Sequence, residues 1–560
     1  MGRSLRGRRW PGLESALPAG VFLACLIYSL VIAGIGWSNT LLGPHGFRQT
    51  QTALSTHSIL QGGPWLGYET PVLGAPWAIP FEFPLYQWTV AAVVTLLGTP
   101  LDQAGRLVSE LFFYATLIPA YVLLASLQVR PRHRVVFLSL LVVSPEYLYW
   151  SRSFMMESTA LFCGMAYLAF AVRSLQRWRP ADLAGAALFG ALAAMVKITT
   201  FFVFLVAAGL YLLGAWWQTG PARWSGKTVG RVVATALVIV LLPVACGAVW
   251  TQFTDILKAH NPLAASFITS AALQQWNLGT AAQRLSGELW LIILNRTLPD
   301  IVGHGVVVLA SILLMIGERR RLVSFLVCLA LFLTAPLAFT NLHMVHNYYA
   351  YANGVFLVAA IGWCVVSYLE RADRWKWVGV AVLLAAVGAS LWRYQRVYIP
   401  WQRTNNVRLL DSASVLQGST TPDAVVLILG LDWSSELPYY ARRRALMNRE
   451  YRSPQDPIMQ RALANLGDQR LGAMVVCFGA LRQPALIQSW LRATGLSPIA
   501  RRTAGCVIYT RRVSARRENG ARDLNSRVNR CRSSKVPAKF SALEPGRRAT
   551  WLPLAASLVR

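Results

Sequence analysis

Residues 107–179 read LVSELFFYATLIPAYVLLASLQVRPRHRVVFLSLLVVSPEYLYWSRSFMMESTALFCGMAYLAFAVRSLQRWR. The stretch holds three apolar runs, near 107–127, 134–150 and 156–173, which are separated by the basic cluster RPRHR and the turn SPEYLYWSRSFMMES. A helix of about 20 apolar residues crosses a bilayer, and a tilted helix manages with about 17. The stretch therefore predicts consecutive membrane-spanning helices.

The rest of the chain has the same character. Of its 560 residues, 55% are hydrophobic and 14% are charged, and the mean hydropathy is +0.43. Soluble domains carry about 25% charged residues. Further candidate spans lie near 17–37, 182–197, 199–217, 231–250, 300–317, 322–340, 348–368 and 376–394. We expect a mostly α membrane domain of about eleven spans at 17–394, after a cytoplasmic N-terminus at 1–16.

Basic clusters set the expected orientation, because short cytoplasmic loops collect Lys and Arg. Six clusters alternate with the spans: GRSLRGRRW at the N-terminus, RPRHR, RSLQRWR, RWSGKTVGR, ERRR and ERADRWK. They alternate only if the apolar run at 85–99 does not cross the membrane. This run is then an amphipathic or re-entrant helix within a long outer loop, residues 38–106. We expect a multi-pass inner (plasma) membrane protein with its N-terminus in the cytoplasm.

The chain carries a formal charge of +30, but no basic stripe interleaved with aromatic residues runs along any one element. Nucleic-acid binding is therefore not indicated. Much of the charge lies in the tail at 511–560, which lacks apolar periodicity and is expected to be disordered.

Residues 395–510 follow the last predicted span and should form a small periplasmic α/β domain. The β-like runs AVVLILGL, GAMVVCFG and GCVIYT alternate with helical stretches such as PALIQSWLRATGL. Cys477 and Cys506 lie in two of these runs, so a disulfide is possible in an oxidising compartment. Five other cysteines fall inside apolar runs and are expected to be buried thiols, and no CxxC motif is present.

Polar and ionisable residues gather in the predicted outer loops and at span ends, where their high cost at membrane depth makes them functional candidates. Carboxylates and histidines transfer protons, and cations bind an anion such as a phosphate. The candidates are His45, Arg48, Gln49, Glu82, Tyr86, Arg152, Glu157, Lys197, His343, His346, Tyr348 and Tyr349.

The order of these motifs resembles the GT-C glycosyltransferases. A long outer loop holds an Arg-containing helix start (GPHGFRQTQTA) and FEFPLYQW, and it is followed by SP…SR…Glu and a Gly/Ala-rich span ending in Lys. The resemblance covers about residues 17–400 and is closest to the branch of protein O-mannosyltransferases and the lipid A aminoarabinose transferase (glycosyltransferase family 39-like). GLDWSSELPYYARRRALM, residues 430–447, looks like the outer-domain motif of the bacterial members.

The resemblance implies an integral membrane enzyme that takes a sugar from a polyprenyl-phosphate carrier. It would transfer the sugar to a lipid, glycan or protein acceptor on the periplasmic face. The implied donor-phosphate ligands are Arg48, Arg152 and Lys197. From the polar set in the outer loops, the candidate substrate-binding residues are Gln49, Tyr86, His343, His346, Tyr348 and Tyr349. No cofactor or bound metal is expected, although a role for a divalent metal stays open.

Two positions depart from the family pattern. His45-Gly46 stands where an acidic pair is expected, and Phe83 replaces a Lys of the lipid A enzyme. The base that deprotonates the acceptor is therefore His45, Glu82 or Glu157. The unperturbed pKa of histidine, near 6.5, suits the first of these.

Other interpretations remain at this stage. The alternatives are a transporter or flippase of a lipid-linked sugar and a non-catalytic membrane scaffold, although no internal repeat supports transport. Glu82 is a candidate for a simple ion pair with Arg48, and Arg152 for an interfacial residue whose head reaches water. The sugar, the acceptor and the oligomeric state stay open.

Overall fold

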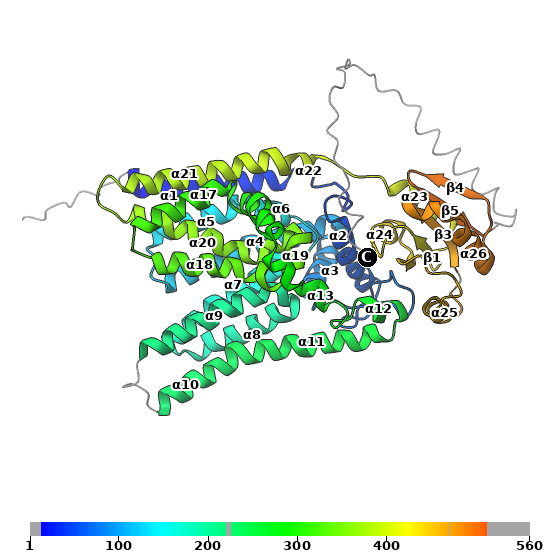
Figure 1. Ribbon diagram of the computed structural model, residues 1–560, viewed down its shortest axis with the longest axis horizontal. Coiled ribbons are helices and arrows are strands. Elements are labelled where there is room, and N and C mark those ends of the chain that lie inside the picture. The colour runs from blue at the N-terminus through cyan, green and yellow to red at the C-terminus, as the bar shows by residue number, and fades with distance from the viewer. Residues whose placement is uncertain (1–12, 220–225, 470, 512–560) are drawn as a thin grey trace, which may run out of the picture. The chain divides into compact units, whose positions relative to one another are not determined.

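The computed structural model describes residues 13–219, 226–469 and 471–511 (Figure 1). Most of the expected N-terminal segment 1–16 and all of the expected disordered tail except Arg511 lie outside the described residues. The first part of the chain forms α1 (Leu13–Ala33), α2 (Gly46–Leu60), α3 (Leu85–Leu97), α4 (Leu101–Ser126), α5 (Pro131–Val143), α6 (Pro145–Trp150), α7 (Glu157–Arg177), α8 (Pro180–Val196) and α9 (Ile198–Thr219).

The helices continue to Arg403. They are α10 (Gly226–Ala236), η2 (Leu237–Leu241), α11 (Leu242–Ala259), α12 (Pro262–Phe267), α13 (Gln274–Leu278), α14 (Ala281–Leu285), α15 (Gly287–Ile292), η3 (Ile293–Thr297), α16 (Leu298–Val302), α17 (Gly305–Gly317), α18 (Leu322–Ala338), α19 (Thr340–Val345), η4 (Asn347–Tyr349), α20 (Ala350–Leu369), α21 (Lys376–Arg393), η5 (Tyr394–Tyr398) and α22 (Ile399–Arg403).

Six helical segments among the described residues are long and apolar enough to cross a membrane: Leu101–Ser126, Glu157–Arg177, Ile198–Trp217, Val229–Ala259, Asn347–Leu369 and Lys376–Arg403. A seventh candidate is the pair Gly287–Val302 and Gly305–Gly317, which is bent by 88°. Four shorter apolar helices accompany them: Leu17–Ala33, Leu85–Leu97, Pro180–Val196 and Leu322–Ala338. The chain is therefore a mostly helical, multi-pass membrane protein.

Local breaks shape the helices near the candidate site. The expected continuous span 134–150 is divided into α5 and α6 at Ser144, because Pro145 has no N–H for an α-helical bond and disfavours helical geometry at the residue before it. α8 and α9 are divided at Lys197, whose backbone is extended. α3 has 13 residues, or about 20 Å at 1.5 Å per residue, which is shorter than a bilayer core of about 30 Å.

The chain after α22 forms a small α/β region, which belongs to the same compact unit as the helices. Its elements are α23 (Leu410–Ser419), β1 (Val425–Leu429), α24 (Glu436–Ala441), β2 (Arg444–Asn448), α25 (Pro457–Ala464), β3 (Leu471–Cys477), η6 (Phe478–Arg482), α26 (Pro484–Thr494), β4 (Ala500–Thr503) and β5 (Cys506–Thr510). The strand order is β2-β1-β3-β5-β4, with β2, β1 and β3 parallel and β5 antiparallel to both β3 and β4. We call this region the sheet domain.

The sequence predicted β1, β3, β5 and α26 of the sheet domain. Cys477 and Cys506 are register partners on β3 and β5 and form a disulfide, as the sequence allowed. β2 and β4 were not predicted, because RALMN and ARRT are short and carry Arg residues. The sheet domain starts after the helical segment ends at Arg403, later than the expected residue 395.

The segment between α1 and α4 joins the helices to the sheet domain. The Gly74 N–H donates to the Ala445 carbonyl at 3.0 Å, and the Met447 N–H donates to the Val72 carbonyl at 2.9 Å. This pairing covers the edge of β2, which would otherwise expose unpaired backbone groups. α2 lies between the long helices and the sheet domain and contacts α3, α4 and α24 (Figure 1).

Candidate active site

The site begins at the N-terminus of α2. His45 precedes the helix with φ 51°, a left-handed conformation that turns the chain sharply into it. The imidazole Nε2 lies 2.9 Å from the Asn347 amide oxygen. Its ring contacts those of Trp150, His346 and Tyr348, with ring centroids 5.2, 5.4 and 4.8 Å away. Residues about 300 positions apart in sequence therefore surround one imidazole.

Burial determines the protonation of His45. It lowers the pKa of the imidazole, and the hydrogen bond to Asn347 opposes this effect only in part. The amide oxygen of Asn347 accepts hydrogen bonds, so Nε2 carries the hydrogen in this arrangement. The other ring nitrogen, Nδ1, then holds a free lone pair. His45 is therefore a neutral imidazole at neutral pH, with one nitrogen able to accept a proton.

One turn further along α2, Arg48 forms an ion pair with Glu82 and donates to the side-chain oxygen of Gln51. The two ion-paired side chains are 17% and 19% exposed, so the pair lies partly open to solvent. The sequence left an Arg48–Glu82 ion pair as one interpretation, and the structure contains it. Both residues thus belong to the group around α2.

A second ion pair lies deeper. Glu157 begins α7, and both of its carboxylate oxygens accept hydrogen bonds from the Lys197 ammonium group at the break between α8 and α9. Their side chains are 2% and 7% exposed. The Lys197 ammonium also lies 4.5 Å from the ring centroid of Tyr349 and 5.3 Å from that of Tyr348. Burial without a partner would make either charge costly, and the pairing offsets that cost.

The turn TNLHMVHNYY supplies the opposite wall. Arg296 of η3 donates to the backbone carbonyls of His343 and Met344, which holds the turn in place. Burial lowers the pKa of both His343 and His346 to about 3. These two histidines are consequently neutral at physiological pH and offer hydrogen bonds rather than positive charge.

Three predicted site residues lie apart from this group. The hydroxyl of Tyr86 donates to the Gly105 carbonyl at 2.8 Å and packs α3 against α4. The Gln49 amide donates to the Pro44 carbonyl and accepts from the backbone of Phe154, so it is fully engaged in local structure.

Arg152 also lies in a different polar cluster. Its guanidinium donates to the Ile35 carbonyl at 2.6 Å, and its charge interacts with Glu110 and Arg106 of α4. Its side chain therefore stabilises the contact with the end of α1, and its expected role in phosphate binding stays a prediction.

Lys258 is a site residue that sequence reasoning missed. It lies at the end of α11, only 6% exposed, and its ammonium group is 4.9 Å from the ring centroid of Phe81. Its one hydrogen-bond partner in the described part of the chain is the Thr254 hydroxyl at 3.5 Å, and no carboxylate there forms an ion pair with it. Its charge interacts with those of Asp255, one turn earlier in α11, and Arg48. A lone Lys in the apolar helical stretch TQFTDILKA was the available signal.

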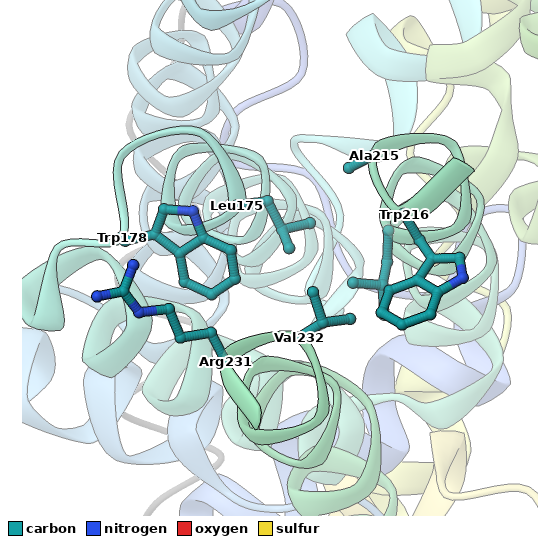
Figure 2. A pocket seen from close by; sticks show the side chains of 7 residues that line it. Leu175, Trp178, Ala215, Trp216, Arg231 and Val232 are labelled. Carbon is teal, nitrogen blue, oxygen red and sulfur yellow. The ribbon is translucent and has the colours of Figure 1, made fainter. Parts of the chain in front are cut away.

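The described residues contain no group of three or more His, Cys, Asp or Glu side chains placed to hold a metal ion. A cavity of about 200 Å³ lies elsewhere, between the ends of α7, α9 and α10 (Figure 2). Trp178 and Arg231 line it together with mainly apolar side chains, and no candidate site residue does. This cavity is therefore separate from the site around His45.

No protein-family model matches the sequence, and no curated protein matches it either. Solved structures do match in three dimensions. The structure of ArnT from Cupriavidus metallidurans bound to undecaprenyl phosphate aligns with a TM-score of 0.58 at 14% identity, over 89% of this chain and 99% of that one. The apo form of the same enzyme gives 0.54 at 14% identity, over 88% and 98%. The match is one of fold at low identity.

A third match comes from the oligosaccharyltransferase of Archaeoglobus fulgidus in a complex with zinc and sulfate. It has a TM-score of 0.51 at 11% identity, over 82% of this chain and 68% of that one. These neighbours are GT-C glycosyltransferases. The chain has the GT-C fold. The resemblance of the motif order to this class is thereby confirmed at the level of fold.

Several elements of this fold meet at the candidate site. The residues around His45 lie where α2, the α8–α9 break and the turn before α20 meet, beside the segment that carries Glu82. The charges of Arg296 and Glu157 act on the His45 imidazole, and those of Arg48 and Lys197 act on the neighbouring His346. Lys258 joins the group through its interaction with Arg48. Such an arrangement can bind an anionic leaving group and accept a proton from a hydroxyl group.

Proposed function

We propose that the chain is an integral membrane glycosyltransferase that moves a sugar from a polyprenyl-phosphate carrier to an acceptor hydroxyl. The observation that carries the proposal is the group of cations in a GT-C fold: Arg48 interacts with both Lys197 and Lys258, and Arg48, Lys197 and His45 all act on His346. It is supported by the fold likeness to an enzyme solved with undecaprenyl phosphate. The acceptor class is a lipid, glycan or protein.

Charge balance suggests how the donor phosphate binds. Arg48 and Lys197 each form an ion pair with a carboxylate, whereas Lys258 forms none in the described residues and only feels the charge of Asp255 from a greater distance. A lipid phosphate bound beside all three would neutralise the charge of Lys258. It would also interact with Arg48 and Lys197, which keep their carboxylate partners. Buried charges are stable only when paired, so Lys258 is expected to contribute most to donor affinity.

The transfer reaction also needs a group that accepts the proton of the acceptor hydroxyl. We assign this role to Nδ1 of His45, because Glu82 and Glu157 are each held by a cation while Nδ1 has no partner in the described structure. The acceptor oxygen attacks the anomeric carbon as its proton passes to Nδ1. The bond from the anomeric carbon to the phosphate oxygen breaks, and its electron pair stays on the phosphate. Direct displacement inverts the anomeric configuration.

We propose that the site and the sheet domain lie on the periplasmic side of the inner membrane. The Cys477–Cys506 disulfide supports this placement, because disulfides persist in oxidising compartments. The alternation of basic clusters supports it independently. No resident cofactor is required by the proposed chemistry.

Mass spectrometry of envelope lipids and glycans tests the function. Cells that produce the wild-type chain should contain a glycosylated product that is absent from cells with His45→Ala, while Glu82→Gln and Glu157→Gln show which carboxylates matter. If His45→Ala makes the product at the wild-type level and one Gln variant makes none, that carboxylate is the base. Identical profiles with and without the gene would refute the proposed transfer.

A further inference from the structure

A second hollow has a volume of about 180 Å³. It lies where the sheet domain meets two other segments, the one between α1 and α2 and the one that follows α22. Leu42, three residues before His45, lines one side, and Glu436 and Phe478 of the sheet domain line the other. Asn406 and Arg408, which follow α22, complete it. The hollow therefore joins three parts of the chain beside the start of α2.

Glu436 presents a carboxylate without a cationic partner. Its Oε2 accepts a hydrogen bond from the Ser434 hydroxyl at 3.1 Å, and no Lys or Arg of the described chain forms an ion pair with it. Its Oε1 occupies the space that a side chain at Gly46 would need. Burial raises the pKa of this carboxyl group. Glycine at position 46 thus lets a carboxylate from the sheet domain reach the residue next to His45.

Arg408 presents an unpaired positive charge in the same hollow. Its guanidinium lies 4.5 Å from the ring centroid of Phe478, and no carboxylate among the described residues pairs with it. The Asn406 side chain accepts from the Arg408 N–H at 3.1 Å and donates to the Leu42 carbonyl at 2.9 Å, which fixes the backbone beneath. Phe478 has φ 48°, a conformation that is rare and strained for a bulky residue.

The hollow therefore contains one carboxylate and one guanidinium that do not pair with each other, beside the apolar side chains of Leu42 and Phe478. Their charges cancel, so a neutral ligand suits the site better than an anion or a cation. A sugar has hydroxyl groups that donate to a carboxylate and accept from a guanidinium, and its C–H faces pack on apolar side chains. Small-molecule sites combine such apolar walls with a few polar groups.

We propose that this hollow is the acceptor subsite and binds a neutral sugar unit of a glycan-bearing acceptor. The inference rests on the proposed transferase function and narrows its acceptor class. Leu42 and Gly46 flank His45 in the chain, so a glycan held by Glu436 and Arg408 lies beside the segment that carries the proposed base.

Saturation-transfer NMR on the full-length protein in nanodiscs tests the subsite, with glucose, galactose, mannose and N-acetylglucosamine as probes. The wild type should transfer saturation to at least one of these sugars. Glu436→Ala and Arg408→Ala should each weaken binding of that sugar roughly tenfold, the worth of a hydrogen bond to a charged group. Arg482→Ala, an exposed Arg of the sheet domain outside the hollow, is the matched control and should bind like the wild type.

Arg408 is exposed, so its replacement tests the idea even if Glu436→Ala folds poorly. Binding of undecaprenyl phosphate is measured in the same preparations. A wild type that binds this lipid but none of the four sugars overturns the subsite and leaves the transferase proposal standing. A wild type that does not bind the lipid overturns the transferase proposal itself. Unchanged sugar binding in Arg408→Ala also overturns the subsite.

Discussion

At the scale of single residues, His45 links structure to pH dependence. The neutral imidazole is the form that accepts a proton, and burial lowers its pKa below the ordinary 6.5. We expect kcat/KM to be constant at neutral pH and to fall as the pH drops through this lowered pKa. His45→Ala should lose on the order of 10²- to 10⁴-fold in rate. Transfer assays across pH measure both effects.

Asn347→Asp is the companion variant. A carboxylate at this position would stabilise the imidazolium form and raise the pKa of His45, so the acid limb of the profile should move to higher pH. Asn347→Ser keeps a neutral partner and serves as the control. An acid limb at the same pH in wild type and Asn347→Asp would show that another group is titrating.

Replacing Lys258 tests its proposed contact with the donor phosphate. Lys258→Met keeps the length of the side chain and removes a buried charge that forms no ion pair in the described chain. Folding should therefore be preserved or improved, while the affinity for undecaprenyl phosphate should fall by roughly 10- to 100-fold. Lys197→Met should instead destabilise the fold, because it leaves Glu157 buried without its cation. Binding and thermal unfolding of both variants separate the two roles, and equal donor affinity in Lys258→Met and wild type would contradict the assignment.

At the scale of elements, the turn between α18 and α20 depends on Arg296 of η3. Its guanidinium bonds two backbone carbonyls of the turn, so Arg296→Met leaves these acceptors unpaired in a largely buried setting. We expect faster hydrogen exchange in residues 339–349 and weaker transfer, without a change elsewhere. Arg319→Met, at an exposed position between α17 and α18, is the control. Exchange that stays at the wild-type rate in the turn would mean that its own helices suffice to order it.

At the scale of the whole molecule, orientation decides which compartment the site faces. Reporter fusions after Arg134, Arg179 and Arg321 should give cytoplasmic signals, and fusions after Thr99, Gly279 and Arg403 should give periplasmic ones. Arg403 is chosen because the last long helix ends there. The Cys477–Cys506 disulfide should accordingly resist thiol labelling until a reductant is added. A cytoplasmic signal after Arg403 would remove the proposed periplasmic site.

Structural features that depend on short stretches of sequence could be predicted without the structure. Long apolar runs predicted the long helices, and short β-like runs between helical stretches predicted β1, β3 and β5. The motif order also indicated the class of fold, which the structural neighbours confirm. These features depend on residues that are close together in the sequence, so the sequence alone is enough to predict them. The break within 134–150 was also implicit in Pro145, although its effect on the helix appears only in three dimensions.

Contacts between distant segments were decided by tertiary structure alone. The sequence placed Arg48, Arg152 and Lys197 in one group, but packing turned Arg152 toward the end of α1 and brought Lys258 beside Phe81 instead. It also set Glu436 against Gly46, about 390 residues away in the chain. A sequence gives the identity of a charge and its neighbours along the chain. Whether that charge finds a partner depends on how helices and strands pack, because a side chain bonds only the groups that folding brings within a few ångströms.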